Sequence, residues 1–250
     1  MNFQIIPVGE QALNLVFPEK IDVQENRLIH QIAEQLKTAD WPTIIDLIPA
    51  YHTLTINYNV EKTDFEKISQ DLKAFINSLN FNENSSQKQR VVEIPVCYGD
   101  KFGPDLMAVA EFAQMSPAEV VKMHTSQPYY VYFLGFLPGF AYAGFVPDKI
   151  AMPRLQQPRL QLAAGSVGIA GKQTGMYPVA SPGGWRIIGQ TPLRLYDPKN
   201  PLPPYHAGDW LQFNSVSSDE FYQIQQAADS GKYSIKTHFL MTTAATRGAK

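Results

Sequence analysis

Glycine and proline recur so densely between Tyr129 and Pro198 that no long helix fits in this part of the chain. The apolar runs between them are short and rich in aromatic and β-branched residues, which is typical of strands joined by shaped loops. We therefore expect strands and loops throughout the segment. We further expect it to form a binding site and not a scaffold.

Positive charge is concentrated in the same segment. Six cations and no carboxylate lie between Lys149 and Tyr196, although the net charge of the 250 residues is −2, so the remainder sums to about −8. Such segregation favours a small anionic ligand, and solvated surface side chains are the competing interpretation for any single cation. The six cations are Lys149, Arg154, Arg159, Lys172, Arg186 and Arg194.

A general base for neutral pH is missing from the segment. No histidine occurs between Thr125 and Tyr205, and the nearest carboxylate before the cationic run is Asp148. The base must therefore come from Asp148, from elsewhere in the fold or from another chain. We interpret the segment as half of a site and assign no catalytic residue.

Composition excludes several classes of protein. The single cysteine, Cys97, cannot form an intrachain disulfide and fits a reducing cytoplasm; beside a predicted strand, it is expected to be a buried small hydrophobe. Residues 125–147 carry no charge, but their tyrosines, glycines and proline are poor for an inserted helix. The first residues have neither a basic region nor an A-x-A cleavage site, so we do not expect a signal peptide. The five histidines do not have the sequence spacing of metal ligands, so no metal site is predicted. Nucleic-acid binding is disfavoured because the pI is near 6.2 and no basic helix is expected.

The first 80 residues predict a small α+β domain. Asp22 with Glu25 and Thr63 with Glu66 have the spacing of capping boxes, and apolar residues follow each at helical intervals. The order ββαββα favours an open sheet with two helices on one face. The expected elements are strands 3–8, 12–17, 43–48 and 53–58, a helix over 23–39 and a second helix beginning at residue 63.

Residues 80–90 are polar and turn-rich, which predicts a domain boundary and divides the chain into residues 1–84 and 85–250. The second part begins with a strand over 91–98 and short helices after residues 105 and 116 that pack on a barrel. Many short strands up to residue 216 favour a closed or nearly closed β-barrel, which hides their edges. A last helix is expected over 221–228, and the end from residue 242 is expected to fray.

Three motifs suggest a ligand. In the run Gly135 to Phe140, glycines and a proline between aromatics would let backbone amides approach a ligand; a packed barrel corner is the competing interpretation. Residues 164–175 resemble a phosphate loop but fail its pattern, because Ser166 stands at the first glycine position and Gln173 follows Lys172. ATP binding by this loop is therefore disfavoured, although the hydroxyls of Ser166 and Thr174 could bind a carboxylate or an amide.

The third motif, residues 181–186, is a turn that places Trp185 beside Arg186. An arginine fork beside an aromatic ring commonly recognises a carboxylate, whereas Trp185 in the core with Arg186 in solvent is the rival interpretation. Neither G-x-S-x-G nor S-x-x-K occurs around these serines, which disfavours a serine hydrolase.

These motifs carry a family resemblance. GFLPGFAYAGF, the two Pro-Arg pairs at 153–154 and 158–159, AAGSVGIAGKQTGMYP and SPGGWRIIGQTPLRLYDP resemble the signature blocks of the 5-oxoprolinase B subunit. This family is also described as kinase-A inhibitor and as allophanate hydrolase subunit 1, or carboxyltransferase subdomain. The match is dense over about 70 residues, and the layout of the rest of the chain also fits.

The resemblance implies an α+β N-terminal domain followed by a cyclophilin-like β-barrel. It also implies one component of a hydrolase that, with the C and A subunits of 5-oxoprolinase, opens 5-oxo-L-proline to L-glutamate, with ATP as co-substrate of the complex and no cofactor bound by this chain alone. Leu137 departs from the family pattern, where a small residue is expected, and would narrow the pocket. The substrate-binding residues implied by position are Gly135, Phe136, Pro138, Gly139, Phe140, Arg159, Ser166, Gln173, Thr174, Tyr177, Gly183, Gly184, Trp185 and Arg186.

Three other functions stay open. An inhibitor that binds a sensor histidine kinase needs no catalytic base. A carboxyltransferase half-domain of urea or allophanate metabolism needs a biotinylated partner, and this chain has no biotin-type lysine motif. A prolyl isomerase rests only on analogy of fold.

Overall fold

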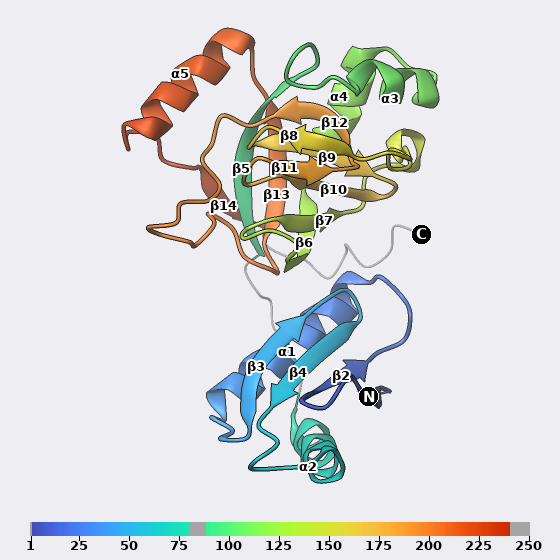
Figure 1. The fold of residues 1–250 in the computed structure, drawn as a ribbon. Coiled ribbons are helices and arrows are strands. Elements are labelled where there is room, and N and C mark those ends of the chain that lie inside the picture. The colour runs from blue at the N-terminus through green and yellow to red at the C-terminus, as the bar shows by residue number, and fades with distance from the viewer. Residues whose placement is uncertain (1, 81–88, 241–250) are drawn as a thin grey trace. The chain divides into compact units, whose positions relative to one another are not determined.

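A computed structural model of the chain describes residues 2–80 and 89–240 (Figure 1). Contacts divide the chain into two compact units, Met1–Ser85 and Ser86–Lys250. The predicted boundary between residues 84 and 85 lies outside the described residues, as does the end expected to fray from residue 242.

The first unit is an antiparallel sheet with two helices on one face (Figure 1). Its strands lie in the order β1-β2-β4-β3, and in β4 Leu54, Ile56 and Tyr58 alternate toward the core. One apolar cluster joins these side chains to residues of both helices, so the helices cover the same face. The elements are β1 (Gln4–Pro7), β2 (Ala12–Val16), α1 (Val23–Thr38), β3 (Ile44–Pro49), β4 (Thr53–Tyr58) and α2 (Phe65–Ser78).

The two helix caps differ from the predicted capping boxes. The Asp22 carboxylate accepts hydrogen bonds from the amides of Gln24 and Glu25, but Oε1 of Glu25 is buried without a hydrogen-bond partner among the described residues. At α2 the cap is Asp64 and not Thr63, because extended backbone at Asp64 lets its carboxylate accept from the amide of Lys67. A single carboxylate, Asp22 in α1 and Asp64 in α2, therefore caps each helix without a partner from a capping box.

The second unit is a closed barrel, as the density of short strands predicts. Seven strands form the ring β5-β12-β9-β10-β7-β6-β13, which returns to β5. The strands are β5 (Gln89–Tyr98), β6 (Tyr129–Leu134), β7 (Ala141–Gly144), β9 (Ser166–Ala170), β10 (Gln173–Met176), β12 (Arg186–Gln190) and β13 (Trp210–Ser215). Outside the ring are α3 (Leu106–Ala113), α4 (Pro117–His124), η1 (Asp148–Ile150), β8 (Arg159–Leu162), β11 (Ser181–Gly183), α5 (Ser218–Asp229) and β14 (Thr237–Leu240).

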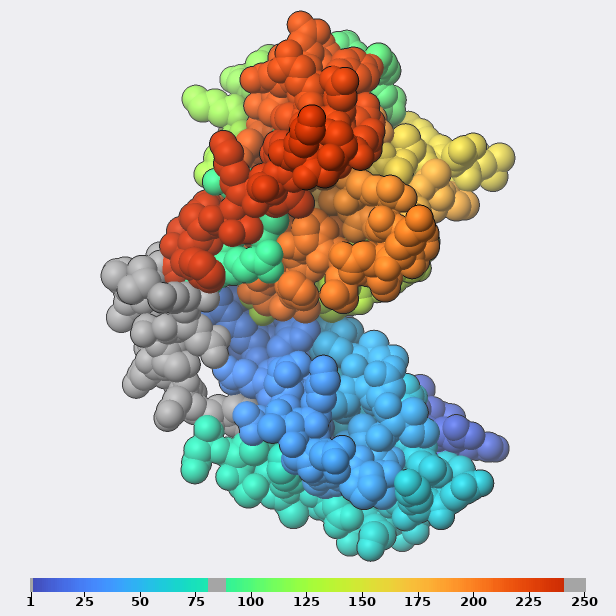
Figure 2. Space-filling view, turned by 90° about the vertical axis from the view of Figure 1, so that its left-hand side faces the viewer, coloured from blue at the N-terminus to red at the C-terminus, as the bar shows by residue number. Residues whose placement is uncertain are grey.

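Strand β5 closes the barrel. One edge pairs in parallel with β13 from Val91 to Val96, and the other edge is shared between β14 and two residues of β12, Gly189 and Gln190. Figure 2 shows only a small part of β5 between the red C-terminal segment and the orange loop before β13. Because only Gly189 and Gln190 of β12 pair with β5, the ladder that closes the barrel there is short.

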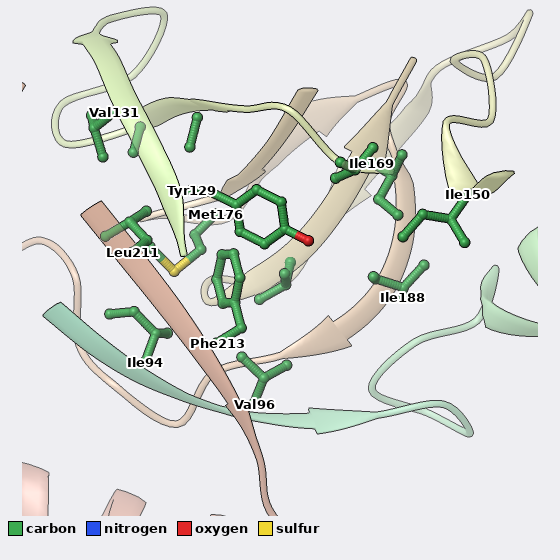
Figure 3. Close-up of a cluster of buried hydrophobic side chains, with 14 of the residues drawn as sticks. Ile94, Val96, Tyr129, Val131, Ile150, Ile169, Met176, Ile188, Leu211 and Phe213 are labelled. Carbon is green, nitrogen blue, oxygen red and sulfur yellow. The ribbon is translucent and has the colours of Figure 1, made fainter. Parts of the chain in front are cut away.

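The barrel interior is apolar (Figure 3). Side chains from β5, β6, β9, β12 and β13 meet there, and Leu106, Val109 and Val120 of α3 and α4 join the same cluster. The expectation that these two helices pack on the barrel is thus confirmed, and so is the burial of Cys97, which raises the pKa of its thiol. The labelled core residues are Ile94, Val96, Tyr129, Val131, Ile150, Ile169, Met176, Ile188, Leu211 and Phe213.

Residues 129–198 are scaffold as well as loops, which corrects the expectation of a site and not a scaffold. They supply β6, β7, β9, β10 and β12, five of the seven barrel strands. The glycines that shorten the apolar runs allow close strand packing, as Gly189 shows: a Cβ there would lie 2.6 Å from Cγ1 of Val96. None of the described helices is long and apolar enough to cross a membrane.

Candidate functional site

An aromatic cluster lies on the outer side of the barrel wall. Ala141 and Ala143 of β7 point into the barrel core, so Tyr142 between them points outward. Phe140 packs edge-on against Trp185, with ring centroids 5.2 Å apart, and against Tyr177 at 5.1 Å. The cluster joins β7, the end of β10 and the start of β12, which brings together the three motifs that suggested a ligand.

The small ribbon formed by β8 and β11 covers this cluster. Leu162 of β8 and Ile187 of β12 are buried with the aromatic rings. Gly183 of β11 has no space for a side chain, because a Cβ there would lie 2.4 Å from the hydroxyl oxygen of Tyr177. Glycine at this position therefore allows the ribbon to pack closely on the aromatic cluster.

The loop that joins β6 to β7 bears an unusual aromatic residue. Phe136 has a φ of 66°, a conformation that bulky residues rarely adopt, and it is 64% exposed. Its ring lies edge-on to Phe140 at 5.7 Å, and the loop from Leu134 to Gly139 lines a shallow hollow. Strained residues of this kind concentrate at functional sites, so the loop is a candidate ligand contact.

Three of the six cations are already paired with carboxylates. Arg159 of β8 donates two hydrogen bonds to Asp105, at 2.7 and 2.8 Å, and this contact raises the pKa of the guanidinium. Lys172 is 2.8 Å from Asp148, and Arg194 is 3.8 Å from Asp197. Residues 149–196 contain no carboxylate, but half of their cations are nevertheless paired, because the carboxylates come from other parts of the chain.

The carboxylate of Asp105 links several elements of the barrel unit through hydrogen bonds. It is 7% exposed, and besides Arg159 it accepts a hydrogen bond of 2.7 Å from the amide of Ile187. Its own amide donates to the carbonyl of Ile187. The start of α3, the ribbon strand β8 and the barrel strand β12 are therefore tied together at one buried carboxylate.

Two arginines lie beside the Trp185 turn. Nε of Arg186 donates to the carbonyl of Pro153 at 3.1 Å, and Arg186 is only partly buried. The exposed Arg154 reaches over Gly184, where a Cβ would lie 3.6 Å from its Nη2 atom. Neither guanidinium forms an ion pair within the described residues.

Comparison with known proteins identifies the family. The model of the carboxyltransferase domain, subdomain C and D, matches residues 3–205. The 5-oxoprolinase B subunit of Bacillus subtilis (strain 168) is 39% identical over 240 residues, which cover 92% of this chain and 99% of that protein. The chain belongs to the family of 5-oxoprolinase B subunits.

Solved structures agree with this assignment. A conserved uncharacterized protein from Pyrococcus horikoshii is 40% identical, with a TM-score of 0.51, over 87% of this chain and 100% of that chain. The urea carboxylase of Kluyveromyces lactis has a TM-score of 0.79 at 19% identity, over 95% of this chain and 24% of that chain, and shares the fold. The family of 5-oxoprolinase B subunits thus shares its fold with part of a larger carboxylase.

The residues implied by the family resemblance divide into two groups. Most lie in the aromatic cluster, in the ribbon or in the β6–β7 loop that adjoins them. Ser166, Thr174 and Arg159 instead have partners within the fold: Ser166 donates to the carbonyl of Ala163, and Thr174 is fully buried in the barrel core. Gln173 lies on β10, where its backbone pairs with Ala170 and Gly144.

Thr174 belongs to a buried polar chain that the sequence did not indicate. Its hydroxyl donates to the carbonyl of Gly168 and lies 2.9 Å from Nε2 of His124, whose Nδ1 is 2.8 Å from the hydroxyl of Tyr98. These partners require Nε2 to carry the proton and Nδ1 to accept from Tyr98. Burial lowers the pKa of His124 to about 3, so the imidazole is neutral and is held away from solvent.

Sequence reasoning missed His124 because its partners are 26 and 50 residues away. It gave no role to Tyr142, although this residue lies inside the block GFLPGFAYAGF, and it named Arg154 only as one of the six cations and as part of a Pro-Arg pair. A usable signal existed for Tyr142, since it alternates with two alanines on a short strand. Within residues 2–80 and 89–240, no group of three His, Cys, Asp or Glu side chains could hold a metal ion.

Gly175 gives a direct test of the packing around the cluster in this 5-oxoprolinase B-subunit relative. A Cβ at Gly175 would lie 2.4 Å from the carbonyl oxygen of Ala141 and 3.2 Å from the Trp185 ring. We expect Gly175→Ala to lower the free energy of unfolding by about 1–3 kcal/mol, because the obstacle is backbone. Gly135→Ala is the control, since its Cβ would make ordinary contact with Phe133 at 3.4 Å; equal losses in urea unfolding would contradict the argument.

Proposed function

We propose that this chain is the B subunit of an ATP-dependent 5-oxoprolinase and opens 5-oxo-L-proline to L-glutamate together with the A and C subunits. The similarity to 5-oxoprolinase B subunits over nearly the full length carries the proposal. The site adds support, because arginines without ion-pair partners lie beside an aromatic cluster, which suits a small ring that bears a carboxylate. The cyclophilin-like character of the barrel and a cytoplasmic location belong to the same proposal.

The reaction must activate a stable lactam. Transfer of the γ-phosphoryl group of ATP to the amide oxygen forms a phosphorylated intermediate and ADP. Attack of one water at the ring carbon then breaks the C–N bond, with the proton going to the nitrogen, and leaves an acyl phosphate, which a second water hydrolyses to L-glutamate and phosphate. This chain would bind and orient the substrate through Arg186 and the aromatic cluster. Asp105 and Asp148 are each bound to a cation, so another component of the complex is proposed to supply the base, and the isolated chain is expected to be inactive.

The experiment is 5-oxo-L-proline-dependent release of L-glutamate and ADP. We compare this chain alone, the A and C partners without it, and all three together. Activity only in the full mixture is expected, because the site on this chain lacks its own base. Full activity of the partners without this chain would contradict its role as an obligate component.

A kinase inhibitor is the alternative tested by the same comparison. If no mixture is active while the partners respond in a control reconstitution, the next measurement is binding of this chain to the dimerisation helices of a sensor histidine kinase. A carboxyltransferase half-domain ranks lower: urea amidolyase of Lachancea kluyveri is only 22% identical, and this chain covers 14% of it. In that case activity would require a biotinylated partner.

A further inference from the structure

The backbone that carries Arg154 is fixed at several points. The amide of Leu155 donates to the carbonyl of Gly184 at 2.7 Å, and Arg186 donates to the carbonyl of Pro153. The carbonyl of Met152 accepts from the amide of Gly171 at 2.9 Å. The residues on either side of Arg154 are therefore tied to the barrel wall, and the side chain extends from a defined position.

The guanidinium of Arg154 lies beside the backbone of Gly184. A Cβ on Gly184 would lie 3.6 Å from Nη2 and 3.7 Å from Nε of Arg154. The planar group thus lies close to the backbone just before Trp185, within the cluster region and beside Arg186. In Figure 2 the yellow segment around residues 150–160 projects from the second unit, which leaves it open to solvent on this side.

Arg154 differs from Arg159, Lys172 and Arg194 in having no ion-pair partner among the described residues, and from Arg186 in having no side-chain hydrogen bond there. Arg159, Lys172 and Arg194 each contact a carboxylate, whereas no salt bridge or side-chain hydrogen bond of Arg154 occurs in the described part of the chain. A guanidinium presents a rigid fork of donors that matches a carboxylate. An unpaired fork on an ordered backbone is therefore a candidate carboxylate-binding group.

Two tyrosines lie within the electrostatic reach of Arg154. Burial raises the pKa of Tyr142 and of Tyr177, and the positive charge of Arg154 opposes this rise in both. Both hydroxyls therefore stay protonated at neutral pH. Tyr142 is only partly buried, so its ring offers apolar surface next to the cation, where the uncharged body of a small ligand can rest.

We propose that Arg154 binds the carboxylate of a small ring-shaped substrate, with Arg186 as the second cation and Tyr142 as the apolar contact. This assignment rests on the proposed function for the identity of the ligand, 5-oxo-L-proline. Arg159, which the family resemblance implied as a substrate-binding residue, is not used here because its guanidinium is occupied by Asp105.

The test is ligand-observed NMR with the full chain. The probes are 5-oxo-L-proline, 2-pyrrolidinone, which has the same ring without the carboxylate, and inorganic phosphate. We expect a dissociation constant on the order of 1 mM for 5-oxo-L-proline and at least roughly tenfold weaker binding of 2-pyrrolidinone. Phosphate binding as tight as that of 5-oxo-L-proline would overturn the assignment to a carboxylate.

Variants locate the site. Arg154→Met keeps most of the stem and is expected to weaken binding roughly tenfold or more, and Arg154→Lys by an intermediate factor, because it keeps the charge but loses the fork. Lys232→Met removes an exposed cation beyond α5 and should leave binding unchanged. Equal affinities of wild type and Arg154→Met would overturn the proposal.

The assembled enzyme separates this inference from the proposed function. In the full mixture, Arg154→Met is expected to raise KM for 5-oxo-L-proline roughly tenfold with a smaller change in kcat, because the carboxylate takes no part in bond breaking. An inactive wild-type mixture combined with Arg154-dependent binding to the chain would refute the proposed function and support the site. An active mixture with wild-type KM in Arg154→Met would refute the site alone.

Discussion

Asp105→Ala is expected to lower the stability of the barrel unit by about 3 kcal/mol. The substitution removes the acceptor of two hydrogen bonds from Arg159 and one from the buried amide of Ile187. The guanidinium and the amide are then left without partners in a poorly solvated place, and that cost exceeds the value of the pair itself. Arg159 is a third exposed, so water offsets part of the loss and keeps it at the lower end of the range for buried pairs.

Hydrogen exchange by mass spectrometry is the appropriate measurement, because peptides from β12 report on the barrel unit alone. Asp197→Ala is the matched control: it removes a carboxylate whose contact with Arg194 is 3.8 Å long and largely exposed, and we expect a cost below about 1 kcal/mol. Arg159→Met should have an intermediate effect, since Asp105 keeps the amide of Ile187. Equal protection of β12 from exchange in all three variants would show that the hydrogen bonds of Asp105 do not stabilise this part of the barrel.

Acidification is expected to destabilise the barrel unit through His124. The pKa of this imidazole is about 3 in the folded protein and near 6.5 in an unfolded chain, so the unfolded state takes up the proton first. The contribution is present above pH 6.5 and is lost progressively between pH 6.5 and pH 3. Its size is at most about 4–5 kcal/mol, because each pKa unit corresponds to about 1.4 kcal/mol.

The comparison is wild type against His124→Gln, followed by urea unfolding between pH 4 and pH 8. The variant is less stable at pH 8, because Tyr98 and Thr174 lose well-placed partners, but the pH dependence between 4 and 6.5 should be much smaller than in wild type. His238→Gln, on the exposed strand β14, is the control and should keep the wild-type slope. An unchanged slope in His124→Gln would mean that carboxylates alone cause the acid sensitivity.

The sequence predicted the elements that depend on local pattern. The strands and helices of the first unit fall within about two residues of expectation, because alternation and helical spacing each follow one core. The short helix expected after residue 116 also forms, as α4, and Ser116 and Glu119 cap it reciprocally. Where two neighbouring residues can both cap a helix, as Thr63 and Asp64 can, the choice depends on backbone geometry that the pattern does not encode.

The candidate site was predictable in its location but not in its chemistry. Aromatic residues and glycines in three motifs suggested a common site, and the fold brings most of them together. Which cations lack a carboxylate partner could not be predicted, because Asp105 reaches Arg159 across 54 residues, whereas Arg154 and Arg186 form no ion pair within the described residues. Thr174 was assigned to a ligand for the same reason: the partner that draws it inward, His124, is set by barrel register and not by sequence distance.

The pairing of β5 determines the order in which the two units can fold on the ribosome. Every strand of the first unit finds its partner within residues 4–58, so that unit can form early in synthesis. Val91 of β5 must wait for Trp210 of β13, and β14 is later still. Cys97 and Tyr98 of β5 can pair earlier with β12, but residues 91–96 stay unpaired until β13 is made. Since loop closure of this length is slow, most of β5 is an unpaired apolar strand during the synthesis of the barrel, which closes only after β13.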